Sequence, residues 1–353
     1  MIFRYLKNPT AITVAVALLF VVALAIATIY FTTDTGDSDA PGSGNRWQPV
    51  QSGVTSTLLD VDFVDPDHGW AVGQDGAIIA TSDAGETWQA QHSGFELTMR
   101  SVDFLDTQNG WAVGHLGLIL HTTDGGETWA QAGHEVALGL DLIQVSFTTP
   151  DSGWIVTERG GFTLRTTDGG ATWNRQFFDS TQAKSDAHIL NDSHSWVSLT
   201  SGGVVSTSDS GESWQLHKGV NQVEIGTSGI YFLDERMGWI AGWRGKERGV
   251  SSGVQFVKYL TDGMVAHTTD GGQTWTRVDA DTGKFLWDVA FIDAREGWTV
   301  GSSGQTMHST DGGLTWSQEP SATDSTLRAI TFSDPNTAWA VGENGTILKL
   351  ARE

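Results

Sequence analysis

Short apolar runs separated by turn-forming residues recur along most of the chain. In the first unit they occupy residues 57–64, 69–73, 77–82 and 87–91, with glycine or aspartate between them. Runs of this length and spacing predict β-strands. Helical periodicity is absent beyond the N-terminal apolar segment, residues 11–31. The pattern therefore predicts an all-β domain built from many short strands.

This four-run unit begins seven times. A tryptophan in the second run marks each unit, with successive spacings of 41, 43, 42, 43, 59 and 41 residues, at Trp70, Trp111, Trp154, Trp196, Trp239, Trp298 and Trp339. A period near 42 with four strands per unit predicts a seven-bladed β-propeller. The last unit stops after its third run, whereas WQPVQSG (47–53) resembles WQAQHSG (88–94), the fourth run of the first unit. We therefore expect the N-terminal strand to complete the seventh blade and to remove a free sheet edge.

Six units end in the string Thr/Ser-x-Asp-x-Gly-x-x-Trp, as in TTDGGETW (122–129). Aspartate in a turn accepts hydrogen bonds from nearby backbone N–H groups, glycine permits a positive φ, and the tryptophan packs on the hairpin. Blade symmetry spreads the six strings around the rim, so their aspartates cannot converge on one substrate. We interpret them as structural turn clamps: Asp83, Asp124, Asp168, Asp209, Asp270 and Asp311.

The N-terminal segment has the features of a membrane anchor. Arg4 and Lys7 precede 21 uncharged residues, 11–31, which are long enough to span a bilayer as a helix. The positive flank predicts a cytoplasmic N-terminus, residues 1–10, and a body outside the cytoplasm. A polar linker, residues 32–45, then leads to the propeller, residues 46–353. A cleaved signal peptide is the alternative, since Ala25 and Ala27 form a small-residue site.

Composition excludes several kinds of chemistry. The chain has no cysteine, which excludes disulfides, a thiol nucleophile and cysteine metal ligands. Its net charge of −22 argues against nucleic-acid binding. His121, His267 and His308 occupy the same place in three different blades, so we expect no shared metal site. No motif calls for a cofactor.

Strand order assigns the loops to two faces of the predicted ring. The six strings and the loops between first and second strands carry 19 acids and two arginines. The opposite face holds 10 of the 18 basic residues in 46–353: Arg100, Arg159, Lys184, Lys218, Arg244, Lys246, Arg248, Lys258, Lys284 and Arg328. Solvated loop charge and a partner-binding face both account for this asymmetry.

One unit is longer than the others by about 17 residues, at 243–264. This insertion and its surroundings combine cations with aromatic residues, a composition typical of interface anchors; a loop elaboration without function is the alternative. Arg100 and Arg328 begin the inner strands of blades two and seven, beside the channel. The predicted partner-binding residues are Arg100, Trp243, Arg244, Lys246, Arg248, Tyr259, Trp287 and Arg328.

The recurring string is the Asp-box, or bacterial neuraminidase repeat. Paired with the preceding Gly-Trp-x-Val-Gly-x-x-Gly pattern, it resembles the photosystem II stability/assembly factor family over nearly all of residues 46–353. That resemblance implies a seven-bladed propeller and a non-enzymatic role, binding a membrane-protein subunit during assembly, partly through arginines. It also implies a thylakoid lumen-type compartment or, in a non-photosynthetic bacterium, the periplasm.

Two other functions are compatible with the same repeat. Sialidases also carry Asp-boxes, but the chain lacks their Phe/Tyr-Arg-Ile-Pro motif. Of its four tyrosines, Tyr5 and Tyr30 belong to the N-terminal membrane region and Tyr231 to a predicted strand, which leaves Tyr259. Other glycosidases need two carboxylates roughly 5–10 Å apart, and no pair is singled out. A carbohydrate-active or carbohydrate-binding propeller and an accessory subunit of an envelope transporter are thus the alternatives to an assembly or scaffold factor.

Overall fold

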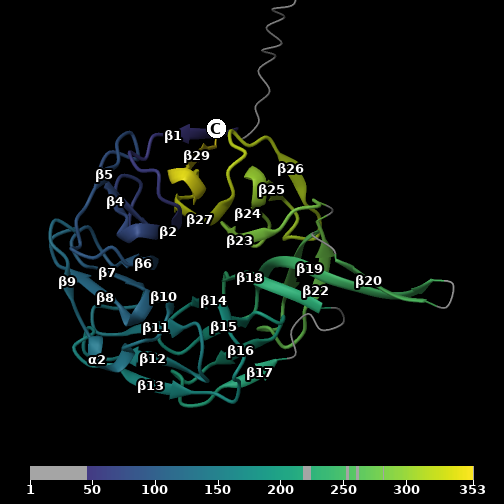
Figure 1. The fold of residues 1–353 in the computed structure, drawn as a ribbon, viewed down its shortest axis with the longest axis horizontal. Helices are drawn as coiled ribbons and strands as arrows, with labels where there is room; N and C mark the ends of the chain where they lie inside the picture. Colours follow the sequence, from purple (N-terminus) through teal and green to yellow (C-terminus); the bar gives the residue numbers. More distant parts are fainter. Residues whose placement is uncertain (1–45, 218–223, 252–253, 260–261, 281, 353) are drawn as a thin grey trace, which may run out of the picture. The chain divides into compact units, whose positions relative to one another are not determined.

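Seven antiparallel sheets are arranged as blades around a central channel (Figure 1). The computed structural model describes residues 46–217, 224–251, 254–259, 262–280 and 282–352. The predicted cytoplasmic segment, membrane anchor and linker, residues 1–45, lie outside the described residues. Among the residues that are described, no helix has the length and apolar character needed to cross a bilayer.

Blades one to four follow the chain, each running from an inner to an outer strand. Blade one contains β2 (Leu58–Phe63), β3 (Gly69–Gly73), β4 (Ile78–Thr81) and β5 (Gln89–Ala90). Blade two contains β6 (Met99–Phe104), β7 (Gly110–Gly114), β8 (Ile119–Thr122) and β9 (Ala130–Gln131). Blade three contains β10 (Leu142–Phe147), β11 (Gly153–Thr157), β12 (Phe162–Thr166) and β13 (Asn174–Phe177). Blade four contains β14 (Lys184–Ile189), β15 (Ser195–Leu199), β16 (Val204–Thr207) and β17 (Gln215–His217).

The remaining blades include the insertion and the closure. Blade five contains β18 (Glu224–Phe232), β19 (Gly238–Ser251), β21 (Gly263–Thr268) and β22 (Thr276–Asp279), with β20 (Val254–Tyr259) paired to β19. Blade six contains β23 (Leu286–Phe291), β24 (Gly297–Gly301), β25 (Thr306–Ser309) and β26 (Ser317–Glu319). Blade seven contains β27 (Leu327–Asp334), β28 (Thr337–Gly342), β29 (Ile347–Ala351) and β1 (Arg46–Val50). Single turns of helix are α2 (His134–Ala137), η1 (Gln74–Gly76), η2 (His115–Gly117), η3 (Ser302–Gly304) and η4 (Glu343–Gly345).

The N-terminal strand closes the ring, as the sequence predicts. β1 pairs antiparallel with β29 over five residues, and Trp47 lies opposite Leu350. The Trp47 side chain is only 3% exposed and packs into a cluster with Trp298, Leu348 and Leu350. The seventh blade therefore joins the two ends of the domain.

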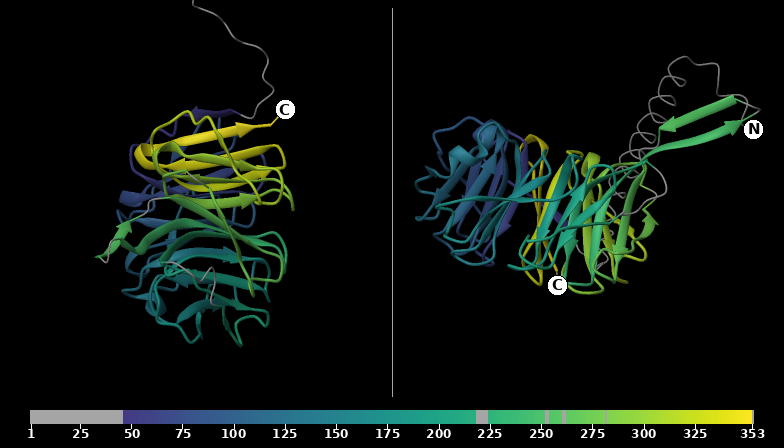
Figure 2. Two further views of the ribbon diagram at one scale, coloured as in Figure 1. Left: turned by 90° about the vertical axis from the view of Figure 1, so that its right-hand side faces the viewer. Right: turned by 90° about the horizontal axis from the view of Figure 1, so that it is seen from below.

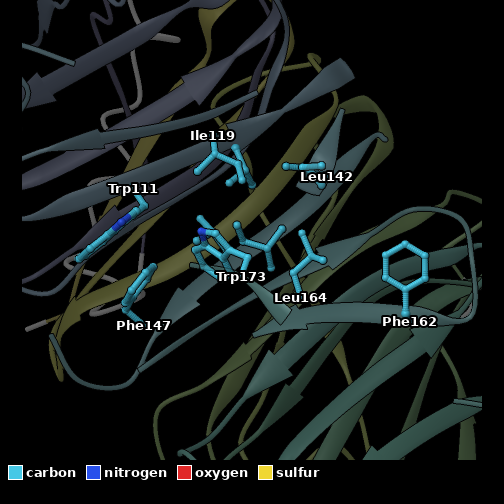
Figure 3. Close-up of a cluster of buried hydrophobic side chains, with 11 residues drawn as sticks. Trp111, Ile119, Leu142, Phe147, Phe162, Leu164 and Trp173 are labelled. Carbon is cyan, nitrogen blue, oxygen red and sulfur yellow. The ribbon is translucent and has the colours of Figure 1, made fainter. Parts of the chain in front are cut away.

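Stacked aromatic rings fill the seams between blades. In the cluster of Figure 3, Trp111 of blade two stacks on Phe147 of blade three with ring centroids 3.6 Å apart, and Trp173 meets Phe147 edge-on. The same pairing joins blade seven to blade one, where Trp339 stacks on Phe63 at 4.8 Å. These contacts repeat because the second strand of every blade carries a tryptophan, and the inner strand of most blades has a phenylalanine at or near its end.

The Asp-box turn of one blade also receives the tryptophan of the blade before it. The indole N–H of Trp70 donates to the Gly125 carbonyl at 3.0 Å, and that of Trp196 donates to Gly271 at 2.9 Å. Trp239 repeats the bond to Gly312 at 2.9 Å. The recurring string thus links neighbouring blades in addition to forming its own turn.

The insertion in blade five forms a β-hairpin. β19 continues past the blade to Ser251 and β20 returns along it, with Lys246 paired to Tyr259 and Ser251 to Val254. This two-stranded ribbon extends away from the ring of blades (Figure 2).

Candidate functional site

The seven inner strands enclose a cavity of about 880 Å³ along the channel. Its lining includes four of the predicted partner-binding residues, Arg100, Trp243, Trp287 and Arg328. Trp243 lies on β19 just where the hairpin leaves the blade, while the other three lie at the beginnings of inner strands. The structure therefore brings these four predicted residues to one cavity.

Three aromatic rings and one arginine pack together at this end of the channel. Trp243 meets Phe285 edge-on at 5.4 Å and lies 6.0 Å from Trp287, measured between ring centroids. The Arg328 guanidinium carbon lies 4.3 Å from the Trp287 ring centroid. We refer to Trp243, Phe285, Trp287 and Arg328 as the channel-mouth cluster. A cation held over an aromatic face is oriented while it keeps its charge.

Arg328 is only partly available to a partner. Its Nη2 donates to Oε1 of Glu343 at 2.6 Å, and 28% of its side chain is exposed. Partial burial opposes ionisation of Glu343, yet hydrogen bonds from Arg328 and Thr326 and the charge of Arg328 lower the pKa of that carboxyl. The guanidinium is thereby fixed in orientation, with further donors that a second carboxylate can use.

Arg100 differs from Arg328 because no ion pair with a described residue fixes its guanidinium. It is the second residue of β6 and is partly exposed on the cavity. Over the ranges that the structure describes, no carboxylate pairs with its guanidinium. This arginine therefore offers its donors to a ligand without first breaking an ion pair.

Lys184 is not an exposed base, contrary to the distribution of charge expected from the sequence. Its side chain is 2% exposed, and its Nζ donates to the Gly160 carbonyl at 2.5 Å and to Thr157 Oγ1 at 3.3 Å. Burial lowers the pKa of Lys184 to about 8, although the charge of Glu158 opposes this effect. Lys184 thus holds the loop after β11 in place.

The hairpin places the remaining predicted residues by their backbone. Arg244 and Lys246 pair with β18 at Ile225 and Glu224, and Arg248 pairs with Val257 on β20. The side chains of Arg244, Lys246, Arg248 and Tyr259 lie outside the described residues, so their part in the site stays a prediction.

All six Asp-box aspartates lie on separate turns and form the same bonds. At Asp124, Oδ1 accepts from Thr122 Oγ1 and from the Thr128 N–H, both at 2.8 Å, and Oδ2 accepts from Thr128 Oγ1 at 2.6 Å. The hydrogen bonds from Thr128 are the main reason that the pKa of Asp124 is lowered. The pKa values of the other five are lowered by equivalent bonds, against a burial effect at Asp270 and Asp311. This geometry is that of a turn clamp.

Sequence reasoning missed a second set of aspartates, which bridge the inner strands. Asp62 Oδ2 accepts the Phe104 N–H of the next blade at 2.8 Å, and Asp288 Oδ2 accepts the Ile330 N–H at 2.9 Å. Asp60, Asp103 and Asp186 make equivalent bonds. The available signal was aspartate alternating with apolar residues in a strand, as in LLDVDF (58–63).

Burial keeps these bridging carboxyls largely neutral below neutral pH. It raises the pKa of Asp60 to about 6 and that of Asp62 and Asp288 to about 7, although backbone hydrogen bonds oppose the effect. Burial, with repulsion from neighbouring carboxylates, raises the pKa of Asp103 and Asp186 well above the usual value. The centre of the ring thus gains negative charge as pH rises.

The three equivalent histidines do not meet. Each lies opposite its blade's tryptophan, His121 with Trp111, His267 with Trp239 and His308 with Trp298. His308 alone lies between two carboxylates, Glu296 at 3.0 Å and Glu319 at 3.1 Å. Throughout the described ranges, no group of three or more His, Asp or Glu side chains is arranged to hold a metal ion.

The family model described as "Photosynthesis system II assembly factor YCF48" matches residues 41–139 and 280–351. The chain is thus a seven-bladed propeller that is similar to photosystem II assembly factors. The "Photosystem II assembly protein Ycf48" of Thermosynechococcus vestitus (strain NIES-2133 / IAM M-273 / BP-1) is 41% identical over 39 residues. That alignment spans 11% of this chain and 11% of the relative.

Two solved structures show the same fold. "YCF48 bound to D1 peptide" is 23% identical with a TM-score of 0.72, covering 88% of this chain and 98% of that chain. "YCF48 from Cyanidioschyzon merolae" is 23% identical with a TM-score of 0.71, covering 87% and 99%. Similar propellers also include an enzyme, the GH74 xyloglucanase from Xanthomonas campestris, at 15% identity and a TM-score of 0.66 over 86% of this chain and 53% of that one. At such identity the likeness concerns the fold alone.

The matched segments of this assembly factor-like propeller contain much of the channel mouth. Arg100 falls in the first segment, and Trp287 and Arg328 fall in the second. The hairpin of β19 and β20 lies outside both segments. Three residues of the mouth therefore lie within the family match, whereas Trp243 and the hairpin lie in the unmatched stretch 140–279.

Proposed function

We propose that this chain is a non-enzymatic assembly factor that binds a segment of a membrane protein at the channel mouth. The observation that carries the proposal is the channel-mouth cluster, together with Arg100, at the end of a large cavity lined by both polar and apolar residues. A family match that includes Arg100, Trp287 and Arg328 supports it. The solved structure "YCF48 bound to D1 peptide" supports a peptide segment of a membrane protein as the kind of partner.

The chemistry of the mouth suits an acidic segment with an apolar or aromatic neighbour. Arginine grips carboxylates with two parallel hydrogen bonds, and partly exposed tryptophans are frequent anchors of protein interfaces. The opposite face carries the ionised Asp-box carboxylates, which repel an acidic segment. The mouth is therefore the favoured face for such a partner.

The partner's location follows from the N-terminal sequence. Residues 11–31 anchor the protein in a membrane, and residues 32–45 tether the propeller on the far side from the cytoplasm. A photosystem-associated, thylakoid lumen-type compartment agrees with the family match, and the bacterial periplasm is the equivalent elsewhere. In either compartment the propeller meets the exposed segments of membrane proteins.

The decisive experiment is crosslinking and affinity capture from solubilised membranes, followed by direct binding of the captured subunit's exposed segments as synthetic peptides. Arg100→Gln combined with Arg328→Gln is expected to weaken peptide binding at least about tenfold, since two charge-assisted contacts are lost. Arg159→Gln is the matched control, because Arg159 lies on the same face and is exposed but does not line the cavity. Glutamine is used at 328 because a glutamate there would face Glu343.

Three outcomes would contradict the proposal. Peptide binding that is unchanged in the double variant would place the partner elsewhere. Retention or turnover of glycans by the purified chain would favour a carbohydrate-active propeller. Capture of an intact transport complex, with no binding to any isolated subunit segment, would favour the role of transporter accessory subunit.

A further inference from the structure

The inner strands share an irregularity that recurs in every blade. In each blade the inner strand skips a residue in its register with the second strand just before its buried core-facing half, which makes a β-bulge; blades five and seven have one further irregularity each. The skipped residues, in ring order from blade one to blade seven, are Leu59, Arg100, Ile143, Ser185, Ser228, Trp287 and Arg328. All seven line the channel cavity. We refer to them as the bulge ring.

A bulge gives a strand one residue that the ladder does not constrain. The extra residue bends the strand locally and re-aims a side chain, which is why bulges occur at binding sites. Here the channel mouth is built from seven such positions, one from each blade. The fold therefore fixes the positions of these seven side chains but does not require one residue type at all of them.

The ring is divided into two arcs by how its side chains are used. In the arc of blades three to five, Ile143 is 6% exposed, Ser185 Oγ lies 2.8 Å from Ser198 Oγ, and Ser228 Oγ donates to the Leu286 carbonyl at 2.6 Å. These three side chains are therefore committed to packing and hydrogen bonds within the scaffold. Little of their surface and few of their polar atoms remain available to a ligand.

The other arc, blades six, seven, one and two, presents its side chains to the cavity. Trp287 holds Arg328 over its ring, and its own N–H is satisfied by Ser302 Oγ at 3.1 Å. Leu59 and Arg100 are both partly exposed. In ring order the exposed arc reads aromatic, cation, apolar, cation.

We infer that this exposed arc is the element that selects the partner, and that it takes a segment in which an apolar residue is flanked by two acidic ones. The two carboxylates would pair with Arg328 and Arg100, and the apolar side chain would rest on Leu59 between them. Trp287 would add contact area beside the first acid. This inference rests on the proposed function and narrows the binding site from one face of the propeller to four residues.

The test uses the full-length chain and nine-residue fluorescent peptides whose central triplet is Glu-Leu-Glu, Gln-Leu-Gln or Lys-Leu-Lys. Fluorescence anisotropy is expected to show binding of the Glu-Leu-Glu peptide at least about tenfold tighter than that of Gln-Leu-Gln, and none for Lys-Leu-Lys. Raising the salt concentration should weaken that binding.

Moving one arginine to the other arc distinguishes the effect of its position on binding from the effect of net charge. Arg100→Ser combined with Ser185→Arg keeps the net charge and moves one arginine to the other arc, so it is expected to lose the preference for Glu-Leu-Glu. Arg100→Lys keeps charge and position but loses two-pronged binding, and it should retain a reduced preference. Thermal unfolding of each variant establishes that it is folded; if the swap does not fold, Arg100→Ser alone replaces it.

The inference fails if the wild-type chain does not distinguish Glu-Leu-Glu from Gln-Leu-Gln, or if the swap binds as the wild type does. Either result leaves the proposed function standing, provided that the captured subunit still binds and the Arg100→Gln, Arg328→Gln variant still weakens it. Conversely, selective binding of the model peptides without any captured membrane protein would support the arc and count against the assembly role.

Discussion

The closing strand β1 allows a sharp test of how the ring is held together. Trp47 is 3% exposed and lies in the cluster that joins blades six and seven, while Gln48, the next residue on the same strand, is exposed. Replacing a buried tryptophan by alanine costs about 3–5 kcal/mol through lost burial and the cavity left behind. For a domain of this size that corresponds to a melting temperature lower by about 6–15 °C. Gln48→Ala is the matched control and should change stability by less than about 0.5 kcal/mol.

Deleting residues 46–53 should cost more than Trp47→Ala. It removes the same tryptophan and also the five-residue ladder with β29, whose edge then becomes a template for pairing with other chains. We expect a lower melting temperature by tryptophan fluorescence and a shift to aggregates in size-exclusion chromatography with light scattering. A synthetic peptide of residues 46–53 should restore part of the loss by adding itself as the missing strand.

One result would show that β1 does not close the ring. A deletion variant that has the same melting temperature as the full chain and remains monomeric would show that β29 does not need β1 as its partner strand. Equal effects of Trp47→Ala and Gln48→Ala would likewise show that burial of the indole contributes nothing to closure.

Three further predictions concern the turns and the channel, each measured by thermal unfolding. Asp124→Ala should lower the melting temperature more than Glu127→Ala on the same turn, with peptide binding unchanged; equal effects would refute the clamp. Gly85→Ala should destabilise more than Gly94→Ala: both have φ near +80°, but a Cβ at Gly85 would lie 2.0 Å from the ring of Trp339, whereas Gly94 faces open space. Because burial raises the pKa of Asp288 to about 7 from the usual 3.8, its contribution to stability is fully present below about pH 4, is lost progressively as pH rises to about 7, and does not change further above that. The change that Asp288→Asn makes to the melting temperature should therefore become more favourable as pH rises from about 4 to about 7 and stay constant from about 7 to about 8; the same change at every pH would contradict the assigned titration.

The scaffold could be predicted from the sequence because it repeats. The period of the strand-two tryptophans set the blade count, and the likeness of 47–53 to 88–94 located the closing strand. The Asp-box turns follow from residue types whose preferred bonds are local, within four positions of the aspartate. Local rules of this kind are visible in a sequence without knowledge of the fold.

The features that were missed depend on contacts between blades or on pairing register. Lys184 was placed among exposed bases because its position near a loop is all that the sequence shows, whereas its burial depends on the loop after β11 that its amine holds. The bridging role of Asp62 needs a neighbour 42 residues away. The bulge ring appears only when strands are paired residue by residue, since a break in the alternation of apolar and polar residues does not by itself identify the skipped residue.

The repeats make an internal comparison possible that distinguishes scaffold from site. Two residues after each bulge position stands an apolar residue in every blade, from Val61 in the first to Ile330 in the last, because that position is buried against its neighbours. At the bulge positions themselves the same seven blades carry leucine, arginine, isoleucine, serine, serine, tryptophan and arginine. A position that packing dictated would show one class of residue around the ring, as its neighbour does. The variety at the mouth therefore shows that the fold requires no single residue class there, and changes in the exposed arc should alter binding at less expense of stability than changes at Ile143, Ser185 or Ser228. That separation is what allows the exposed arc to be exchanged and tested residue by residue on an intact propeller.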